Sequence, residues 1–244
     1  MDQLIRKIVT HKSELEKIIA SSHSWNIITE TWMHLAGISK QKHRNYYPAI
    51  MPSAFASNVF PFCQPMLYSY KDMVRMEIDP DLVIGGTYKD YSESIYSDDF
   101  ALKRLNEYTD EYVETGALDS NLARYCKIGD FPVYVALEGK NRVSLFRKHR
   151  RLIKAMVTKI KYPSPDALLI TKVRPFGVYY VTCSDPAFTY RGNDHETTTV
   201  AFPTLTVPIL REYGVETVVD GFRPAALKEL RAARSSLTFK QMAA

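Results

Sequence analysis

The chain has 244 residues, of which 45% are hydrophobic and 24% are charged, and its formal net charge is +5. This composition excludes intrinsic disorder for most of the chain, because it supplies enough apolar side chains to bury a core. No run approaches the ~20 consecutive apolar residues that a membrane span needs, and the first residues lack the apolar core of a signal peptide. We therefore expect a cytoplasmic protein with no membrane span.

The cysteines and histidines give no signature of a metal site. Cys63, Cys126 and Cys183 are widely spaced and include no CxxC pair, so neither a zinc ribbon nor a disulfide framework is supported. We interpret them as ordinary buried thiols. The tight cluster Asp194-His195-Glu196 lacks further ligands at metal spacing, and we interpret it as part of a polar loop.

Charge is distributed unevenly along the chain. Residues 139–162 contain nine Lys or Arg and no Asp or Glu, so the remainder has 32 − 9 = 23 basic and 27 acidic residues, a net charge of −4. Residues 72–120 contain 13 acidic and four basic residues, a net charge of −9. Two interpretations stay open: the basic block forms a localised anion site, or it is a solvated face that pairs with the chain's own acidic segment.

The N-terminal part, residues 1–70, is predicted to be a helical region packed on the core. Apolar residues recur at helical spacing over the first twenty residues, and Ser13 with Glu16 resembles a capping box at which the helix starts or restarts. A second helix is predicted at Trp25–Ile38. Residues 46–70 are rich in Pro and aromatic side chains, which predicts irregular structure followed by a strand.

Residues 71–234 are predicted to form one domain, followed by a frayed tail at 235–244. Periodicity and turn residues predict the following elements: strands at Met73–Ile78, Leu82–Ile84 and Phe131–Leu137, helices at Ala101–Ala117 and from Val143 to about Val157, a hairpin of Ala167–Lys172 with Gly177–Cys183, a polar loop at Ser184–Thr198, a short helix at Thr206–Tyr213, a strand at Glu216–Val219 and a closing helix at Pro224–Ala233. The predicted fold class is α+β.

The turn between the buried strand ending at Leu137 and the helix beginning at Val143 carries the most informative chemistry. A glycine at such a turn, Gly139, lets the backbone approach an anion, and the amides of the first helical turn then point at that anion. Lys140 and Arg142 add positive charge, and an Arg side chain can bind two phosphate oxygens at once. The predicted phosphate-binding residues are Gly139, Lys140, Asn141, Arg142 and Ser144, the last of which is alternatively a helix cap.

Two further sets of residues extend this predicted site. Glu138, at the end of the strand, is placed to bind a ribose hydroxyl, a metal ion or a water molecule, and is the candidate catalytic residue. In the helix predicted to follow, Arg147 and Arg151 share a stripe beside Lys148 and extend a track of phosphate contacts. The predicted DNA-binding residues are Arg147, Lys148, Arg150, Arg151 and Lys154. The alternative is that Gly139 only makes a turn and the cations form a solvated face.

The order of strand, acidic residue, glycine, two variable residues, arginine and helix resembles the central box of the ParB/sulfiredoxin superfamily, over about residues 75–185. In ParB proteins this box cradles nucleotide phosphates, and the matching positions are Gly139 and Arg142, preceded by Glu138. The resemblance implies a ParB/sulfiredoxin-like core, a small mixed sheet with flanking helices, to which a helical N-terminal extension is added. It also implies a nucleotide ligand, such as ATP or CTP with Mg²⁺.

Departures from the family pattern narrow the functions that the resemblance implies. Lys140 and Asn141 stand where sulfiredoxins have their catalytic cysteine and the following histidine, so peroxiredoxin repair is not expected. Asn141 also replaces the first of two adjacent arginines of the ParB box. An expected hairpin occupies Pro163–Ser184, where chromosome-partition ParB proteins place a helix-turn-helix. Among ParB-like proteins without that DNA-binding helix-turn-helix, the chain is most similar to plasmid fertility-inhibition factors, which block conjugative or T-DNA transfer.

Three hypotheses follow for the function. The first is a nucleotide- and DNA-binding inhibitor of plasmid transfer, whose partner is a protein of a conjugative or type IV secretion system. The second is an NTP-dependent nuclease or phosphotransferase, an NTPase or DNase in which Glu138 is the acid/base or a metal ligand. The third is a protein–protein inhibitor in which the nucleotide pocket is vestigial.

Overall fold

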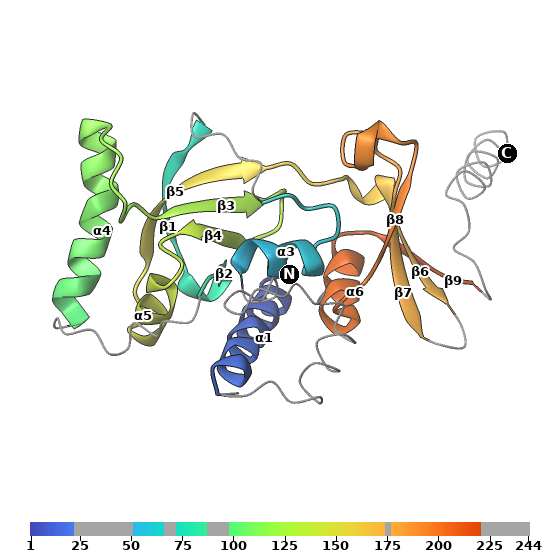
Figure 1. Cartoon of the computed structure of the whole chain (residues 1–244), viewed down its shortest axis with the longest axis horizontal. Coiled ribbons are helices and arrows are strands. Elements are labelled where there is room, and N and C mark those ends of the chain that lie inside the picture. Colours follow the sequence, from blue (N-terminus) through green and yellow to red (C-terminus); the bar gives the residue numbers. More distant parts are fainter. Residues whose placement is uncertain (22–50, 66–71, 87–97, 174–176, 221–244) are drawn as a thin grey trace, which may run out of the picture. The chain divides into compact units, whose positions relative to one another are not determined.

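The computed structural model describes residues 1–21, 51–65, 72–86, 98–173 and 177–220 (Figure 1). The chain divides into two compact units, Met1–Tyr162 and Pro163–Ala244, whereas the sequence predicted a boundary near residue 70. Helices occur together with mixed sheets, so the predicted α+β class is confirmed. The predicted helices at Trp25–Ile38 and Pro224–Ala233 and the predicted tail lie outside the described residues.

The first unit is built on a mixed sheet whose described strands follow the order β1-β5-β3-β4-β2. These strands are β1 (Val74–Ile78), β2 (Val83–Ile84), β3 (Arg124–Ile128), β4 (Tyr134–Glu138) and β5 (Ile153–Ile160). β5 is antiparallel to β1 and parallel to β3, while β4 is antiparallel to β3 and parallel to β2. Because β2 and β4 are parallel, their carboxyl ends lie at the same end of the sheet.

Helices cover both faces of this sheet (Figure 1). They are α1 (Asp2–Ser21), α3 (Pro52–Val59), α4 (Asp98–Thr115) and α5 (Arg142–Lys148), and the short helix η2 (Pro80–Leu82) precedes β2. On one face, Leu102 of α4 and Phe146 of α5 share a buried core with Tyr125 and Ala155 of the sheet. The other face of β4 is buried as well, and α3 lies against this strand. α1 contacts η2 and β2.

The largest correction concerns residues 143–157, which were predicted to form one helix. α5 ends at Lys148, and β5 starts at Ile153. β5 lies between two neighbouring strands and is buried along most of its length. Its short apolar stretch Ala155–Val157, continued from the apolar positions of α5, fits a helix and a buried strand equally well. The prediction that Arg147 and Arg151 share a helical stripe is therefore wrong.

Three smaller predictions also need correction. Part of residues 46–70 forms the helix α3, in place of the predicted irregular structure, and the end of this range, where a strand was predicted, includes residues outside the described ones. α1 runs without interruption, and the Ser13 hydroxyl donates a hydrogen bond to the carbonyl oxygen of Val9 (3.2 Å), so the predicted restart at Ser13 is wrong. The predicted polar loop at Ser184–Thr198 ends in a strand, β8 (Glu196–Thr199). For β8, pairing with β7 overrides the polar character of the local sequence.

The second unit contains a sheet whose described strands follow the order β8-β7-β6-β9. The remaining strands are β6 (Leu168–Val173), β7 (Val178–Cys183) and β9 (Glu216–Asp220), with the helix α6 (Pro203–Glu212) and the short helices η4 (Pro165–Ala167) and η5 (Tyr190–Gly192). β6 and β7 form the predicted hairpin, and β9 returns parallel to β6 after α6. The three cysteines are buried thiols outside any disulfide, as predicted.

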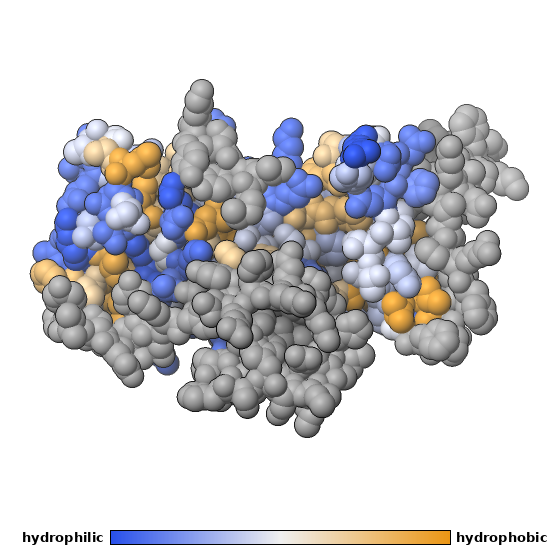
Figure 2. Space-filling view, in the orientation of Figure 1, coloured by the Kyte–Doolittle hydropathy of each residue, from blue (hydrophilic) through white to orange (hydrophobic). Residues whose placement is uncertain are grey.

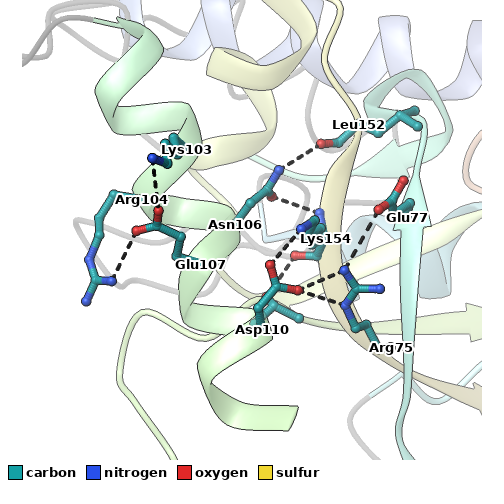
Figure 3. A network of polar contacts seen from close by, with 10 residues as sticks. Arg75, Glu77, Lys103, Arg104, Asn106, Glu107, Asp110, Leu152 and Lys154 are labelled. Carbon is teal, nitrogen blue, oxygen red and sulfur yellow. Dashed lines mark hydrogen bonds and ion pairs between the residues drawn. The ribbon is translucent and has the colours of Figure 1, made fainter. Parts of the chain in front are cut away.

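A polar network fixes α4 against the sheet (Figure 3). The carboxylate of Asp110 accepts hydrogen bonds from Nζ of Lys154 (2.6 Å) and Nε of Arg75 (2.9 Å). Asn106 bonds the carbonyl oxygen of Leu152 and the amide of Lys154, and the buried hydroxyl of Thr109 donates to the carbonyl oxygen of Lys154 (2.9 Å). Hydrophilic residues, blue at the left of Figure 2, gather over this part of the surface.

The network predicts that Asp110 makes a pH-dependent contribution to the free energy of unfolding. Partial burial alone raises the pKa of this carboxyl, but hydrogen bonds from Lys154 and Arg75 outweigh burial and lower it. The contribution is therefore complete above the ordinary pKa of about 4 and is lost as the pH falls through the lowered value. Asp110→Asn should reduce the free energy of unfolding by about 1 kcal/mol at pH 7, and the difference from wild type should vanish in acid.

Urea denaturation of both proteins between pH 7 and pH 2.5 measures this effect. Asp130→Asn is the matched control, because Asp130 and its partner Lys159 are 79% and 60% exposed, and an exposed pair of this kind contributes little. Equal stability of wild type and Asp110→Asn at pH 7 would contradict the prediction.

Candidate functional site

The turn after β4 has the strand-to-helix geometry that the sequence predicts. Gly139 has a φ of +70°, and a Cβ at this position would lie 2.9 Å from Nε of Arg142. Both facts require glycine, because other residues rarely adopt this conformation and have no space here. The turn leads directly into α5 at Arg142.

Arg142 points into the protein at this turn. Its side chain is buried, with 4% exposed, and its guanidinium donates hydrogen bonds to the backbone carbonyl oxygens of Leu105 (3.0 Å) and Asn121. Leu105 belongs to α4 and Asn121 to the segment that leads into β3, so one side chain joins three parts of the first unit. These hydrogen bonds use two of the five N–H donors of the guanidinium, and the burial of the side chain leaves little of it accessible to a phosphate at the surface of the turn.

The other residues predicted around the turn are half-buried and take part in local contacts. The carboxylate of Glu138 lies 3.5 Å from Nη2 of Arg124, on the neighbouring strand β3. The hydroxyl of Ser144 donates to the carbonyl oxygen of Asn141 (3.0 Å), within the turn itself. The carbonyl oxygen of Lys140 accepts a hydrogen bond from another turn, described next. Their roles toward nucleotide, and a catalytic role for Glu138, stay predictions.

A second glycine turn, Gly85–Gly86, follows β2 and lies against the first turn. The amide of Gly86 donates to the carbonyl oxygen of Lys140 (2.8 Å). A Cβ at Gly85 would lie 2.5 Å from Cγ2 of Val143, so the two backbones approach closely only because this residue has no side chain. The ends of the parallel strands β2 and β4 thus meet in a pair of glycine turns, the position at which α/β sheets commonly bind ligands.

The five predicted DNA-binding residues divide into two groups. Arg147 is directed inward: Nη1 donates to Oγ of Ser13 (3.1 Å), Nη2 donates to the carbonyl oxygen of Pro80 (2.9 Å), and Nε lies 3.3 Å from Oδ1 of Asp81. Lys154 pairs with Asp110 as described above. Both cations therefore bind acids of the segment 72–120, as the second interpretation of the charge pattern expected.

The other three cations, Lys148, Arg150 and Arg151, are exposed and form what we name the cationic bend. The amide of Arg151 donates to the carbonyl oxygen of Phe146 (3.1 Å) and the amide of Arg150 to that of Arg147 (3.2 Å), which is the Schellman pattern that ends a helix. Arg150 has a φ of +51°, at the position of this motif that usually holds glycine. The chain thus presents a bulky cation in a conformation that costs about 1–2 kcal/mol.

Two functional candidates lie on α1, and sequence reasoning missed them. Lys12 is 1% exposed, and its ammonium pairs with the carboxylate of Glu16 and donates to the carbonyl oxygen of Gly86 (3.3 Å). The sequence contains a signal for the burial of Lys12, because this residue continues the apolar stripe of Ile5 and Ile8 at helical spacing. A charged residue on a buried stripe predicts an internal ion pair.

Comparisons with protein-family models, with curated proteins and with solved structures find no match. Membership of the ParB/sulfiredoxin superfamily therefore stays a prediction. Within the described ranges, no group of three or more His, Cys, Asp or Glu side chains is placed to hold a metal ion. Among the described helices, none combines the length and the apolar character that a membrane crossing requires.

The position of Arg142 predicts a structural effect when it is replaced. Arg142→Met should lower the free energy of unfolding by roughly 2–4 kcal/mol, because two backbone carbonyls lose a charged donor inside the protein. The control is Arg151→Met, which removes an exposed cation and should change stability by less than about 0.5 kcal/mol. Urea denaturation followed by circular dichroism compares them. Equal stabilities of the two variants would show that Arg142 does not hold these elements together.

The strain at Arg150 predicts that two substitutions which remove the same charge change the free energy of unfolding differently. Arg150→Gly should raise the free energy of unfolding by roughly 0.5–1 kcal/mol, since glycine adopts a positive φ without steric cost. Arg150→Ala removes the same charge but keeps a Cβ in the strained conformation, so it should give no such gain. Thermal unfolding of the three proteins tests this expectation, which fails if the Ala variant is stabilised as much as the Gly variant.

Proposed function

We propose that this chain is a ParB-like inhibitor of plasmid transfer that binds nucleic acid through its cationic bend. The observation that carries the proposal is the exposure of Lys148, Arg150 and Arg151 at one turn, while the neighbouring cations Arg147 and Lys154 pair with Asp81 and Asp110 of the chain itself. Within the described ranges, no ion pair joins Arg150 or Arg151 to an acidic residue. Closely spaced Lys and Arg side chains of this kind suit the phosphate backbone of DNA.

The backbone of the bend adds a second argument for this proposal. A residue held in a disfavoured conformation costs stability, and such residues concentrate where the conformation serves binding or catalysis. Glycine would fit the position of Arg150 better, so retaining a cation there is best explained by a contact that the cation makes. Arginine suits this contact because its guanidinium binds phosphate oxygens in pairs.

The proposed family rests on the order of elements around the glycine turn. The helix α4, the strand β4, the turn at Gly139 and the helix α5 follow one another in the order on which the resemblance is based, and this order supports the proposal. As a fertility-inhibition factor, the protein would act in the cytoplasm on a protein of a conjugative or type IV secretion system. Its nucleotide would be ATP or CTP with Mg²⁺, bound at the paired glycine turns.

The burial of Arg142 favours a second candidate function, a protein–protein inhibitor with a vestigial nucleotide pocket. The guanidinium of Arg142 already binds two backbone carbonyls, and Glu138 pairs with Arg124. A pocket whose key cation has become structural would retain the fold without the ligand. The two candidates differ in whether the protein alone binds DNA.

A triple variant tests the DNA contact. Replacing Lys148, Arg150 and Arg151 together by Ala should weaken binding to a short duplex. It should also reduce the slope of log affinity against log salt concentration by up to about 2.7, since each phosphate contact contributes ~0.9. Fluorescence anisotropy at several salt concentrations measures both quantities.

The matched control replaces Lys7, Lys103 and Arg211, which are exposed cations elsewhere on the chain, so it carries the same net charge. An unchanged salt slope in the bend variant, or an equal change in the control, would refute the contact. If the bend variant loses DNA binding but still inhibits plasmid transfer, the protein–protein candidate is favoured.

A further inference from the structure

The carboxylate of Glu16 lies among cations at the paired glycine turns. It forms an ion pair with the buried ammonium of Lys12, which also donates to the carbonyl oxygen of Gly86. Arg147 of α5 and Lys140 of the first turn act electrostatically on Lys12, and Arg147 also acts on Glu16. The guanidinium of Arg147 also contacts α1 directly, through a hydrogen bond to Oγ of Ser13 (3.1 Å). Cations of α5 and of the first turn therefore lie near the Lys12–Glu16 ion pair.

The carboxylate of Glu16 is held in this position at a cost, because burial disfavours its charge more than the nearby cations favour it. Burial lowers the pKa of Lys12 to about 8 despite the favourable charge of Glu16, and burial raises the pKa of Glu16 despite the opposing charge of Lys12. An ammonium buried in this way depends on a bound anion to stay charged. The side chain of Glu16 is itself 16% exposed, whereas that of Lys12 is 1% exposed, so the anion position is reachable from solvent.

The backbone next to Glu16 also suits an anion. A Cβ at Gly86 would collide with the carboxylate oxygens of Glu16, so the absence of a side chain is what admits the carboxylate. Gly86 follows β2, and its amide binds the turn that follows β4. The position therefore lies at the carboxyl ends of two parallel strands, where α/β sheets commonly hold phosphate-bearing ligands.

We propose that Glu16 is an internal occupant of a phosphate-binding site formed by Lys12, Lys140, Arg147 and the Gly85–Gly86 turn. A phosphate-bearing ligand binds there by displacing the carboxylate, which makes α1 an autoinhibitory element. This inference rests on the nucleotide part of the proposed function and adds its regulation. It also assigns phosphate binding to Lys12 and Arg147, while Arg142 keeps its structural role.

Titration calorimetry with inorganic pyrophosphate tests the inference on the full chain. Apparent affinity falls in proportion to the fraction of molecules whose site is open. If Glu16 fills the site nine-tenths of the time or more, Glu16→Gln should bind pyrophosphate at least about tenfold tighter than wild type. Pyrophosphate should also raise the melting temperature of Glu16→Gln more than that of wild type, because it supplies the missing charge beside Lys12.

Two further variants keep the test decisive. Glu14→Gln removes an exposed carboxylate from the same helix and should bind pyrophosphate as wild type does. If Glu16→Gln does not fold, Glu16→Asp takes its place, because the shorter side chain withdraws the carboxylate from Gly86 and should also tighten binding. Equal pyrophosphate affinity in wild type and in a folded Glu16 variant, judged by circular dichroism, overturns the inference.

DNA binding by the same proteins separates this inference from the proposed function. The Glu16 variants leave the cationic bend intact and should retain wild-type affinity for duplex DNA. Tighter pyrophosphate binding together with no DNA binding by wild type would support the anion site and refute the bend. DNA binding that depends on the bend, with no change in pyrophosphate affinity in the Glu16 variants, would support the bend and refute the anion site.

Discussion

The hydrogen bonds from the buried Arg142 guanidinium to the backbone oxygens of Leu105 and Asn121 determine how the first unit is assembled. They join the β4–α5 turn to α4 and to the segment before β3, and the absence of a Cβ at Gly139 leaves room for the guanidinium. A buried guanidinium is stable only when backbone or acidic oxygens satisfy it. This contact ties the first residue of α5, from which the cationic bend follows, to α4 and to the segment before β3.

The charge pattern of the sequence has a physical explanation in this arrangement. The acidic segment 72–120 supplies Asp81 and Asp110, which bind Arg147 and Lys154 and hold α5 and α4 in place. What remains of the basic block at the end of α5 is the exposed cationic bend. The two interpretations of the block are therefore compatible: part of it is satisfied internally, and part is presented to solvent, where it suits a polyanion.

Sequence reasoning reached some of these features and not others. The turn at Gly139 and the strand before it were predicted, because a continuous apolar run and a glycine before a helix are strong local signals. The first part of the strand at Ile153–Ile160 was predicted as the end of a helix, since a short buried apolar stretch between two strands has the same pattern as a buried helix face. The direction of Arg142 was not predictable, because its partners on α4 and before β3 are distant in sequence. Lys12 was predictable from its position on an apolar stripe.

The central claim is that Arg142 is structural and that the cationic bend contacts nucleic acid. It is tested most directly by following the side-chain Nε–Hε signals of arginines in the ¹⁵N-labelled wild-type protein during titration with a short DNA duplex, with signals assigned from single Arg→Lys variants. The account predicts that the signals of Arg150 and Arg151 shift while that of Arg142 stays unchanged. A shift of the Arg142 signal, with those of Arg150 and Arg151 unchanged, would contradict it.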